Sequence, residues 1–288
     1  MTVLDEAALN HRADPRHESH PMEHHHGANH PVERDLVETA ALAGHLPAAL
    51  LTGARDALCA RALACGITLV SCNDWPALEA INRANLTSWL PIMHRPNGTD
   101  WFWIGAADAD GRIVGTQAGV LLDCTGRSLG ERLSDLSFFY RDPATERTPG
   151  EHCFCASDAA FDSFGKFCYL TAGWTHPDRR GQGLFHLVGR AVRLLAAGRW
   201  APHWWGGLVA PETAAQWTAE KAGPLQLERR PTILYRNPAA GYEYPPLRFM
   251  RISRSGFFLD MRNAVHSWTQ DRMTRPPAPS RHPISEWV

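Results

Sequence analysis

The chain has 288 residues, 44% hydrophobic and 20% charged, so it is long enough for one large domain or two modest ones and too apolar to be disordered throughout. Its 29 Lys and Arg residues are balanced by 30 Asp and Glu residues, which argues against broad electrostatic capture of nucleic acid or an anionic membrane. No apolar run reaches the roughly 18 residues of a membrane-spanning helix, and the N-terminus lacks the pattern of a secretory signal.

The first 34 residues are polar and rich in His and Pro, and they predict a flexible tail. Seven of the 15 histidines lie between His11 and His30, a composition that fits a solvated tail but could also wrap a metal ion. The seven cysteines form no pair of CxxC motifs. We therefore expect buried, reduced thiols in a cytoplasmic protein that requires no metal.

Residues 35–65 are rich in alanine and leucine and predict a helical N-terminal extension of two helices, with Pro47 at the start of the second. The pattern then alternates, as expected for a strand over residues 66–71. Asp74 follows as the N-cap of a helix predicted through residue 90, because its carboxylate can accept a hydrogen bond from the first turn.

A β-hairpin is predicted next, because apolar runs at 101–107 and 112–122 flank an Asp-Gly turn. Residues 128–140 carry leucines at helical spacing and predict an amphipathic helix. A buried strand over 167–175, a glycine-rich turn and a helix to about residue 199 open the second half of the chain.

The last predicted elements are a strand over 204–209, a helix over 211–222 and two strand-like runs at 227–235 and 247–254. A polar, Pro-rich tail begins near Arg275. Strands and helices interleave, with adjacent strand pairs near each end. This order predicts a mixed α/β fold.

The stretch TAGWTHPDRRGQGLFHLVGRAVRLLAA is the most informative in the chain. Gly181 and Gly183 have no Cβ, so the backbone can turn tightly and direct several N–H groups at one point. These donors lie at a helix N-terminus, where unpaired amides and the helix dipole favour an anion, and Arg179 and Arg180 add positive charge. The pattern is neither a Walker loop nor a Rossmann fingerprint. It indicates a site for a phosphate or pyrophosphate.

This stretch resembles the acyl-CoA-binding motif of the GNAT superfamily of acyltransferases, Q/R-x-x-G-x-G/A after a strand that ends in V-x-P. Arg180 and Gly183 match the motif, and Pro177 matches the proline. Thr175 stands in place of the valine, and Phe185 in place of the final Gly or Ala.

A second, looser match is to the family segment N-x-x-A-x-x-x-Y-x-K-x-G. Ala215, Lys221 and Gly223 match it, whereas Glu212 takes the place of the Asn and Ala219 the place of the Tyr.

The resemblance covers about residues 66–260 and implies an α/β, GNAT-like mixed central sheet with flanking helices and splayed central strands at 167–175 and 204–209. Pantetheine would lie between those strands, and the pyrophosphate would sit on the amides that open the following helix. A backbone N–H near Trp174 could polarise the thioester carbonyl. The cofactor-binding residues that the resemblance implies are Trp174, Thr175, Arg179, Arg180, Gly181, Gln182, Gly183, Leu184 and Phe185.

Acyl transfer to an amine needs a base for the amine and an acid for the leaving thiolate. Family members often use a Glu on the central strand and the Tyr of the later helix, but strand 167–175 has no carboxylate and Ala219 replaces that Tyr. The substitutes in this chain are Tyr235 as the acid and Glu212 as a base acting through water.

We therefore expect an acyl-CoA-dependent N-acyltransferase that moves an acetyl or other acyl group from CoA to an amine of a small molecule or peptide. Two alternatives remain: a non-catalytic acyl-CoA-binding module on the same fold, and an interaction or metal-binding protein that uses the His-rich tail. Neither nucleic acid nor a membrane is an expected partner, and the oligomeric state is left open. The expected organisation is a tail (1–34), a helical extension (35–65), a GNAT-like domain (66–262) and a C-terminal tail (263–288).

Overall fold

The computed structural model describes residues 35–42, 47–215, 217 and 223–274, with side chains as far as residue 268. The predictions for the His-rich tail, for Ala219 and for Lys221 therefore lie outside the described residues.

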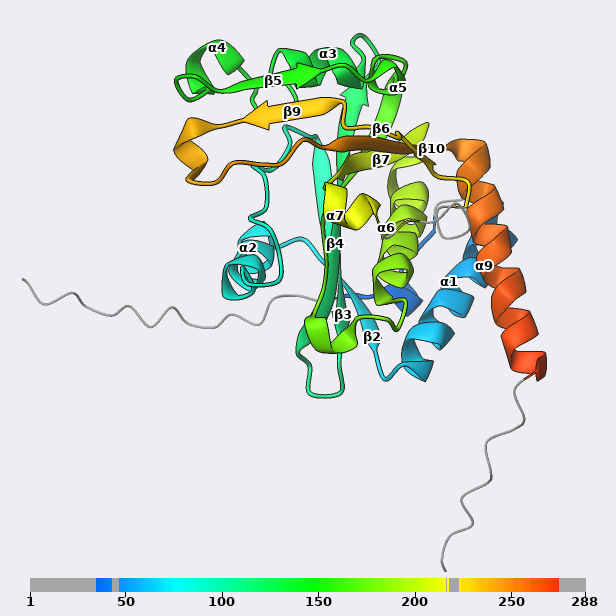
Figure 1. Ribbon diagram of the computed structural model, residues 1–288. Helices are drawn as coiled ribbons and strands as arrows, with labels where there is room; N and C mark the ends of the chain where they lie inside the picture. Colours follow the sequence, from blue (N-terminus) through cyan, green and yellow to red (C-terminus); the bar gives the residue numbers. More distant parts are fainter. Residues whose placement is uncertain (1–34, 43–46, 216, 218–222, 275–288) are drawn as a thin grey trace, which may run out of the picture. The chain divides into compact units, whose positions relative to one another are not determined.

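The central feature of the described chain is a mixed sheet of eight strands in the order β1-β2-β3-β4-β6-β7-β10-β8 (Figure 1). Neighbouring strands are antiparallel except β6 and β7, which run parallel. The predicted mixed α/β fold is thereby confirmed. The strands are β1 (Asp35–Leu36), β2 (Thr68–Cys72), β3 (Asp100–Ala107), β4 (Ile113–Cys124), β6 (Gly165–Thr175), β7 (Trp204–Val209), β8 (Gln226–Leu227) and β10 (Arg248–Ser253).

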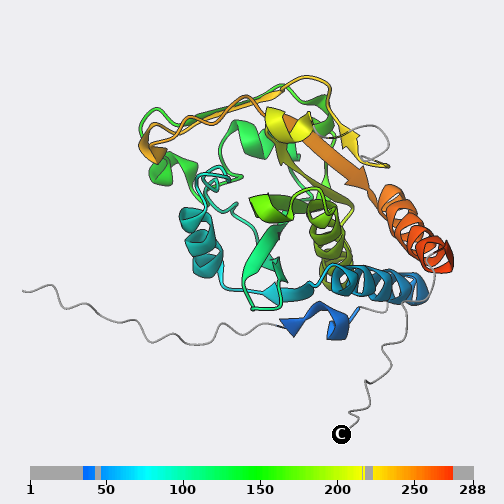
Figure 2. The ribbon, with the colours of Figure 1, turned by 60° about the horizontal axis from the view of Figure 1, so that its bottom comes forward.

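Helices α1 (Ala48–Ala64), α6 (Leu184–Trp200) and α9 (Arg254–Thr274) lie on one side of this sheet, and α2 (Trp75–Ala84) lies on the other (Figures 1 and 2). The sheet therefore separates two hydrophobic cores. On the α6 side, Leu51 of α1, Val192 of α6 and Phe257 of α9 belong to one buried cluster. On the α2 side, Trp103 and Tyr169 belong to another.

Helix α1 packs into the core, because Leu51, Ala54 and Leu58 are buried in the cluster shared with α6. The helix predicted just before it is wrong where the chain is described. Strand β1 and the 3-10 turn η1 (Val37–Thr39) take its place. Pairing of β1 with the edge of β2 and complete burial of Val37 override the local Ala and Leu propensity.

The start of α2 and the turn of the β3–β4 hairpin are as predicted from short-range sequence patterns. The Asp74 carboxylate accepts a hydrogen bond from the Ala77 N–H at 2.9 Å, so it caps α2, although that helix ends at Ala84 instead of continuing to residue 90. The Asp-Gly turn closes the hairpin, with the Gly111 N–H bonded to the Asp108 carbonyl at 3.0 Å.

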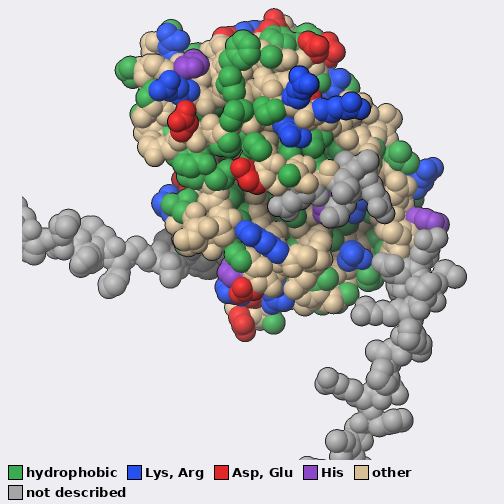
Figure 3. Space-filling model, in the orientation of Figure 1, with side chains coloured by type: hydrophobic (Ala, Val, Ile, Leu, Met, Phe, Trp, Pro, Cys, Tyr) green, Lys and Arg blue, Asp and Glu red, His purple; other side chains and the backbone are tan. Residues whose placement is uncertain are grey.

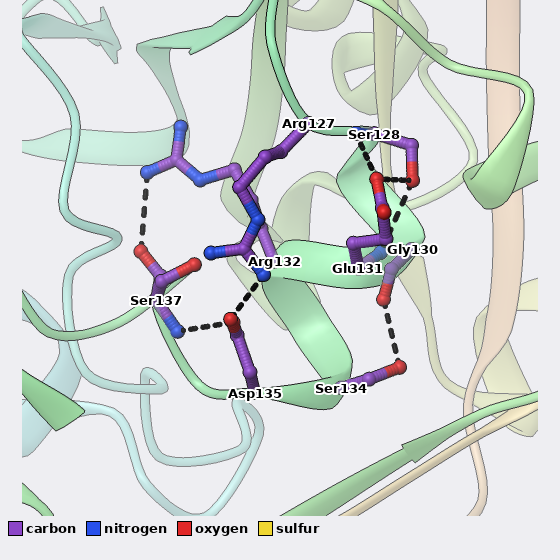
Figure 4. A network of polar contacts seen from close by, with 8 residues as sticks. All are labelled: Arg127, Ser128, Gly130, Glu131, Arg132, Ser134, Asp135 and Ser137. Atoms are coloured by element: carbon purple, nitrogen blue, oxygen red, sulfur yellow. Dashed lines mark hydrogen bonds and ion pairs between the residues drawn. The ribbon is translucent and has the colours of Figure 1, made fainter. Parts of the chain in front are cut away.

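The predicted helix over 128–140 is shorter, because α3 spans only Leu129–Ser134. Ser128 and Glu131 form a capping box at its start (Figure 4). Leu136 has a φ of 66°, a left-handed conformation that ends the helix. Arg132 then holds the segment beyond the helix, because its guanidinium donates to the Ser137 carbonyl at 3.1 Å (Figure 4).

A separate two-stranded sheet joins β5 (His152–Cys155) and β9 (Ile233–Arg236), and the short helices α4 (Pro143–Glu146) and α5 (Asp158–Phe161) flank β5 in the chain. The run predicted at 227–235 is therefore two strands in different sheets. Pro231 lies between them and has no N–H for a ladder.

The predicted boundary between residues 262 and 263 falls inside α9, which continues to Thr274. Its side chains pack on the α6-side core as far along as Val265, which is partly buried against that cluster.

On the face drawn in Figure 3, positively and negatively charged side chains are interspersed. No helix in the described part of the chain combines the length and apolarity needed to cross a membrane.

Candidate functional site

Strands β6 and β7 part after a short parallel ladder. Their partners are Phe167 with Trp204, Cys168 with Trp205 and Tyr169 with Gly206, and no later pair follows although both strands continue. On its other edge β6 stays paired with β4 as far as Thr175. The edge of β6 from Thr171 to Thr175 therefore has no ladder partner in β7. The splayed central strands expected from the sequence are confirmed.

A β-bulge lies in the part of β6 that has no partner in β7. Ala172 and Gly173 stand opposite the single residue Gln117 of β4, where the register shifts. Ala172 has a φ of 52°, a left-handed conformation that costs a non-glycine residue on the order of 1 kcal/mol. The Thr116 hydroxyl holds this bulge by donating to the Ala172 carbonyl at 2.9 Å. Sequence inspection missed Thr116, because no local pattern marks a bulge partner.

The end of β6 presents backbone donors to the open edge. The His176 N–H donates to the Val114 carbonyl of the β4 strand at 2.8 Å. Since successive N–H groups in a strand point to opposite edges, the Thr175 N–H faces away from β4, whereas that of Trp174 faces β4. Of these two predicted cofactor-binding residues, Thr175 is the one that offers its amide to the gap.

The glycine-rich turn leads from β6 into α6 through the 3-10 turn η2 (Pro177–Arg179). Gly181 and Gly183 have φ values of 79° and 75°, in the left-handed region that favours glycine. A Cβ at either position would meet open space within 4 Å. These two residues are therefore glycines because of the backbone conformation, and the space beside them is free for a ligand.

The N-terminus of α6 has no side-chain cap, although Gly183 occupies the N-cap position. The N–H groups of residues 181–185 make no hydrogen bond to any described residue, and the helical ladder begins with Leu187, whose N–H donates to the Gly183 carbonyl at 3.1 Å. Unpaired amides at the positive end of a helix of 17 residues form a site for an anion.

Two arginines flank this turn in different ways. Arg180 donates to the Ser88 carbonyl at 3.1 Å, so it ties the turn to the segment after α2. The side chain of Arg179 makes no hydrogen bond or ion pair with any described residue, and its charge stays available for an anion. Arg180 therefore both positions the turn and contributes charge.

The segment after α2 also packs against the end of β6. The Trp89 and Trp174 rings stack with their centroids 5.1 Å apart, and the Trp174 Nε1 donates to the Ser88 hydroxyl at 3.2 Å. Trp174 is buried by these contacts on the side of the sheet opposite α6. Its side chain is therefore structural, and sequence inspection gave no signal for Ser88 or Trp89.

Phe185, which departs from the family pattern, fills space beside β6. A Cβ at Gly173 would lie 2.9 Å from the Phe185 ring, so the absence of a side chain at Gly173 makes room for it. The Phe185 ring also lies edge-on to that of Trp217, with centroids 6.4 Å apart. Leu184 points into the α6-side core, so only its backbone can serve a ligand.

Tyr235, predicted as an acid, is 4% exposed and donates to the Glu151 carboxylate at 2.7 Å. Tyr140 and Thr148 donate to the same carboxylate. Burial works to raise the pKa of Glu151, but the hydrogen bonds from Tyr235, Thr148 and Tyr140 outweigh it and leave that pKa below its usual value. Burial, and then the bond to Glu151, raise the pKa of Tyr235. A tyrosinate here would face a carboxylate, which makes Tyr235 a weak acid.

We predict that Tyr235→Phe lowers the free energy of unfolding by about 1.5 kcal/mol, because it removes one hydrogen bond to a buried carboxylate. Urea unfolding measures the change. The control is Tyr242→Phe, because the Tyr242 hydroxyl has no hydrogen-bond partner among the described residues, and a change below about 0.5 kcal/mol is expected there. Equal stabilities for the Tyr235 variant and the unaltered protein would contradict the described network.

Glu212, predicted as a base, is exposed in the first turn of α7 (Pro211–Ala214), which follows β7. It is therefore close in the chain to the strand that parts from β6. Among the described residues, Glu212 makes no hydrogen bond or ion pair with the turn before α6, and its role stays a prediction.

In the described part of the chain, no group of three or more His, Cys, Asp or Glu side chains is arranged to hold a metal ion. The proposed metal site in the His-rich tail lies outside the described residues.

No protein-family model matches the chain, and no curated protein sequence matches it. Among solved structures, it is similar to a Klebsiella pneumoniae protein assigned as an acyl-CoA N-acyltransferase, with 16% identity and a TM-score of 0.34 over 65% of this chain and 97% of the other. It is also similar to Arabidopsis thaliana NAA60 in complex with acetyl-CoA, with 14% identity and a TM-score of 0.39 over 64% and 97%.

A third similar structure is a chimera of the spermidine N-acetyltransferase SpeG of Vibrio cholerae with hSSAT, with 10% identity and a TM-score of 0.33 over 65% of this chain and 82% of the other. At such scores the likeness establishes no activity, which has to be inferred from the chain's own residues.

Proposed function

We propose that the protein is an acyl-CoA-dependent N-acyltransferase that uses acetyl-CoA or another acyl-CoA as co-substrate. The observation that carries this proposal is the continuity of the parted edge of β6 with the uncapped, glycine-rich N-terminus of α6. The open strand edge suits the amides of a pantetheine arm, and the free N–H groups of residues 181–185 suit a pyrophosphate. Acyl-CoA contains these two groups in this order.

The proposed reaction is direct transfer. The amine nitrogen attacks the thioester carbonyl, the carbon–nitrogen bond forms, and the carbon–sulfur bond breaks to release CoA. Backbone N–H groups at the open edge of β6 would stabilise the charge that develops on the carbonyl oxygen. Glu212 is proposed to accept the amine proton through water and later release it to solvent. The leaving thiolate takes one proton from solvent, so the protons balance.

A covalent acyl-cysteine route is less well supported by this site. Burial, and then the neighbouring Cys155, raise the pKa of the Cys153 thiol to about 12. Since the thiolate is the nucleophilic form, Cys153 would be almost entirely unreactive at neutral pH.

The test is an acyl-transfer assay on the full chain with acetyl-CoA and a panel of small primary amines and peptides with free N-termini, read by mass spectrometry of the acylated product. Amine-dependent product that requires the protein is the expected result. Glu212→Gln is expected to slow this transfer and leave acetyl-CoA binding unchanged.

A second candidate function is an acyl-CoA-binding module without catalysis. It is favoured by the absence of a carboxylate on β6 and by the engagement of Tyr235 with Glu151. Tight acetyl-CoA binding without product from any amine in the panel would support this module and contradict the transferase.

A further inference from the structure

The hydroxyl of Thr175 is a buried polar group without a partner. Its Oγ1 is shielded from solvent and makes no hydrogen bond to any described residue. Buried hydroxyls in folded proteins are nearly always bonded, and leaving one unmet costs free energy. Thr175 lies in the last position of β6, where the parted strand edge meets the glycine-rich turn.

The face on which this hydroxyl lies follows from its neighbours. Thr175 and Gly173 are two residues apart in a strand, so they point to the same face of the sheet. A Cβ at Gly173 would meet the Phe185 ring of α6, whereas Trp174 packs against Trp89 on the opposite face. The Thr175 hydroxyl therefore lies on the α6 face, beside the first turn of that helix.

Two groups of unmet donors thus converge on one region. The N–H groups of residues 181–185 are unbonded at the start of α6, and the N–H of Thr175 faces the open edge between β6 and β7. The hydroxyl adds a donor between the thioester end of the open edge and the anion-binding turn. Valine, which the family motif has at this position, could not supply it.

We propose that the Thr175 hydroxyl donates a hydrogen bond to a carbonyl of the pantetheine arm of the bound acyl-CoA. This inference rests on the proposed acyl-CoA site and assigns one of its donors to a side chain of this particular sequence. The bound ligand, rather than another part of the protein, accepts the hydrogen bond from this hydroxyl.

The test is calorimetric titration of the full chain with CoA and with ADP, which has the pyrophosphate but no pantetheine arm. Thr175→Val keeps the shape of the side chain and removes the donor. We expect it to weaken CoA binding roughly three- to tenfold, as the loss of one neutral hydrogen bond implies, and to leave ADP binding unchanged. Thr68→Val, at an exposed position of β2, is the matched control and should change neither affinity.

Stability supplies a second readout. Because Thr175→Val removes an unmet buried hydroxyl, its melting temperature should equal or exceed that of the unaltered protein. Thr116→Val removes a hydroxyl that is bonded to the Ala172 carbonyl, and it should lower the melting temperature.

Unchanged CoA affinity in Thr175→Val, or an equal loss of CoA and ADP affinity, would overturn the assignment to the pantetheine arm. A lowered melting temperature would show that the protein itself satisfies the hydroxyl and would also overturn it. Absence of CoA binding by the unaltered protein would contradict the proposed function as well, which separates the two failures.

Discussion

Asp260→Asn is expected to lower the free energy of unfolding by about 3 kcal/mol. The substitution removes the buried negative charge that Arg190 and Arg193 share. Asp260 is 5% exposed on α9, and its two oxygens bind Arg190 and Arg193 of α6 at 3.0 Å and 2.8 Å. This ion-pair network of three residues joins α6 and α9, two of the three helices on that side of the sheet.

The same network gives a pH dependence. Burial works to raise the pKa of Asp260, but the charges of Arg193 and Arg190 and their hydrogen bonds outweigh it, so the pKa in the folded state is lowered. A lowered folded-state pKa means that the contribution is present above the unfolded-state pKa and is lost as the pH falls through the folded-state value. The Asp260→Asn variant should lack this loss of stability at acidic pH.

Urea unfolding at neutral and acidic pH measures both effects. The control is Asp56→Asn, because Asp56 pairs with Arg55 at an exposed position and should change stability by less than about 1 kcal/mol. Similar losses in the two variants at neutral pH would show that the Asp260 pair is no stronger than a surface pair.

Gly183→Trp is expected to weaken acetyl-CoA binding on the order of 100-fold or more, because the indole would occupy the space into which the α6 amides point. A Cβ at Gly183 meets open space, so the substitution does not collide with the fold itself. The left-handed backbone at φ 75° adds strain on the order of 1 kcal/mol. Combination with Arg180→Ala also removes one of the charges beside the turn.

The matched control for this variant is Gly241→Trp, in the connection between β9 and β10. Gly241 has a φ of 65° and also has open space around its Cβ position, so it carries a similar strain at a different place. Calorimetric titration should show normal affinity in that control. Equal affinities for Gly183→Trp and the control would exclude the turn before α6 as the binding site.

Elements set by neighbouring residues were predictable. The Asp74 cap and the Asp-Gly turn follow from short-range hydrogen bonds, and the structure contains both. The predictions were wrong where contacts between residues distant in the chain determine the local structure. The helix expected just before Pro47 is partly replaced by β1, because pairing with β2 is available only in the folded chain. Leu136 adopts a left-handed conformation that ends α3 early, and the spacing of the leucines does not predict this conformation.

The candidate site divides in the same way. The glycine turn followed from one contiguous motif, because the residues that form it are adjacent in the chain. The parting of β6 from β7 was implied only by the family resemblance, because α6 separates these two strands in the chain. The partners of Arg180 and Tyr235 were not predictable. The Arg180 bond to Ser88 spans 92 positions, and the Tyr235 bond to Glu151 spans 84. Such bonds depend on the tertiary arrangement and leave no spacing to detect.

The most direct test of the acyl-CoA site is calorimetric titration of the unaltered, full-length protein with acetyl-CoA and with free CoA. Micromolar binding of both ligands, lost in the Arg180→Ala, Gly183→Trp double variant, is the predicted result. A folded protein that binds neither ligand, nor any longer acyl-CoA, would contradict the proposed function.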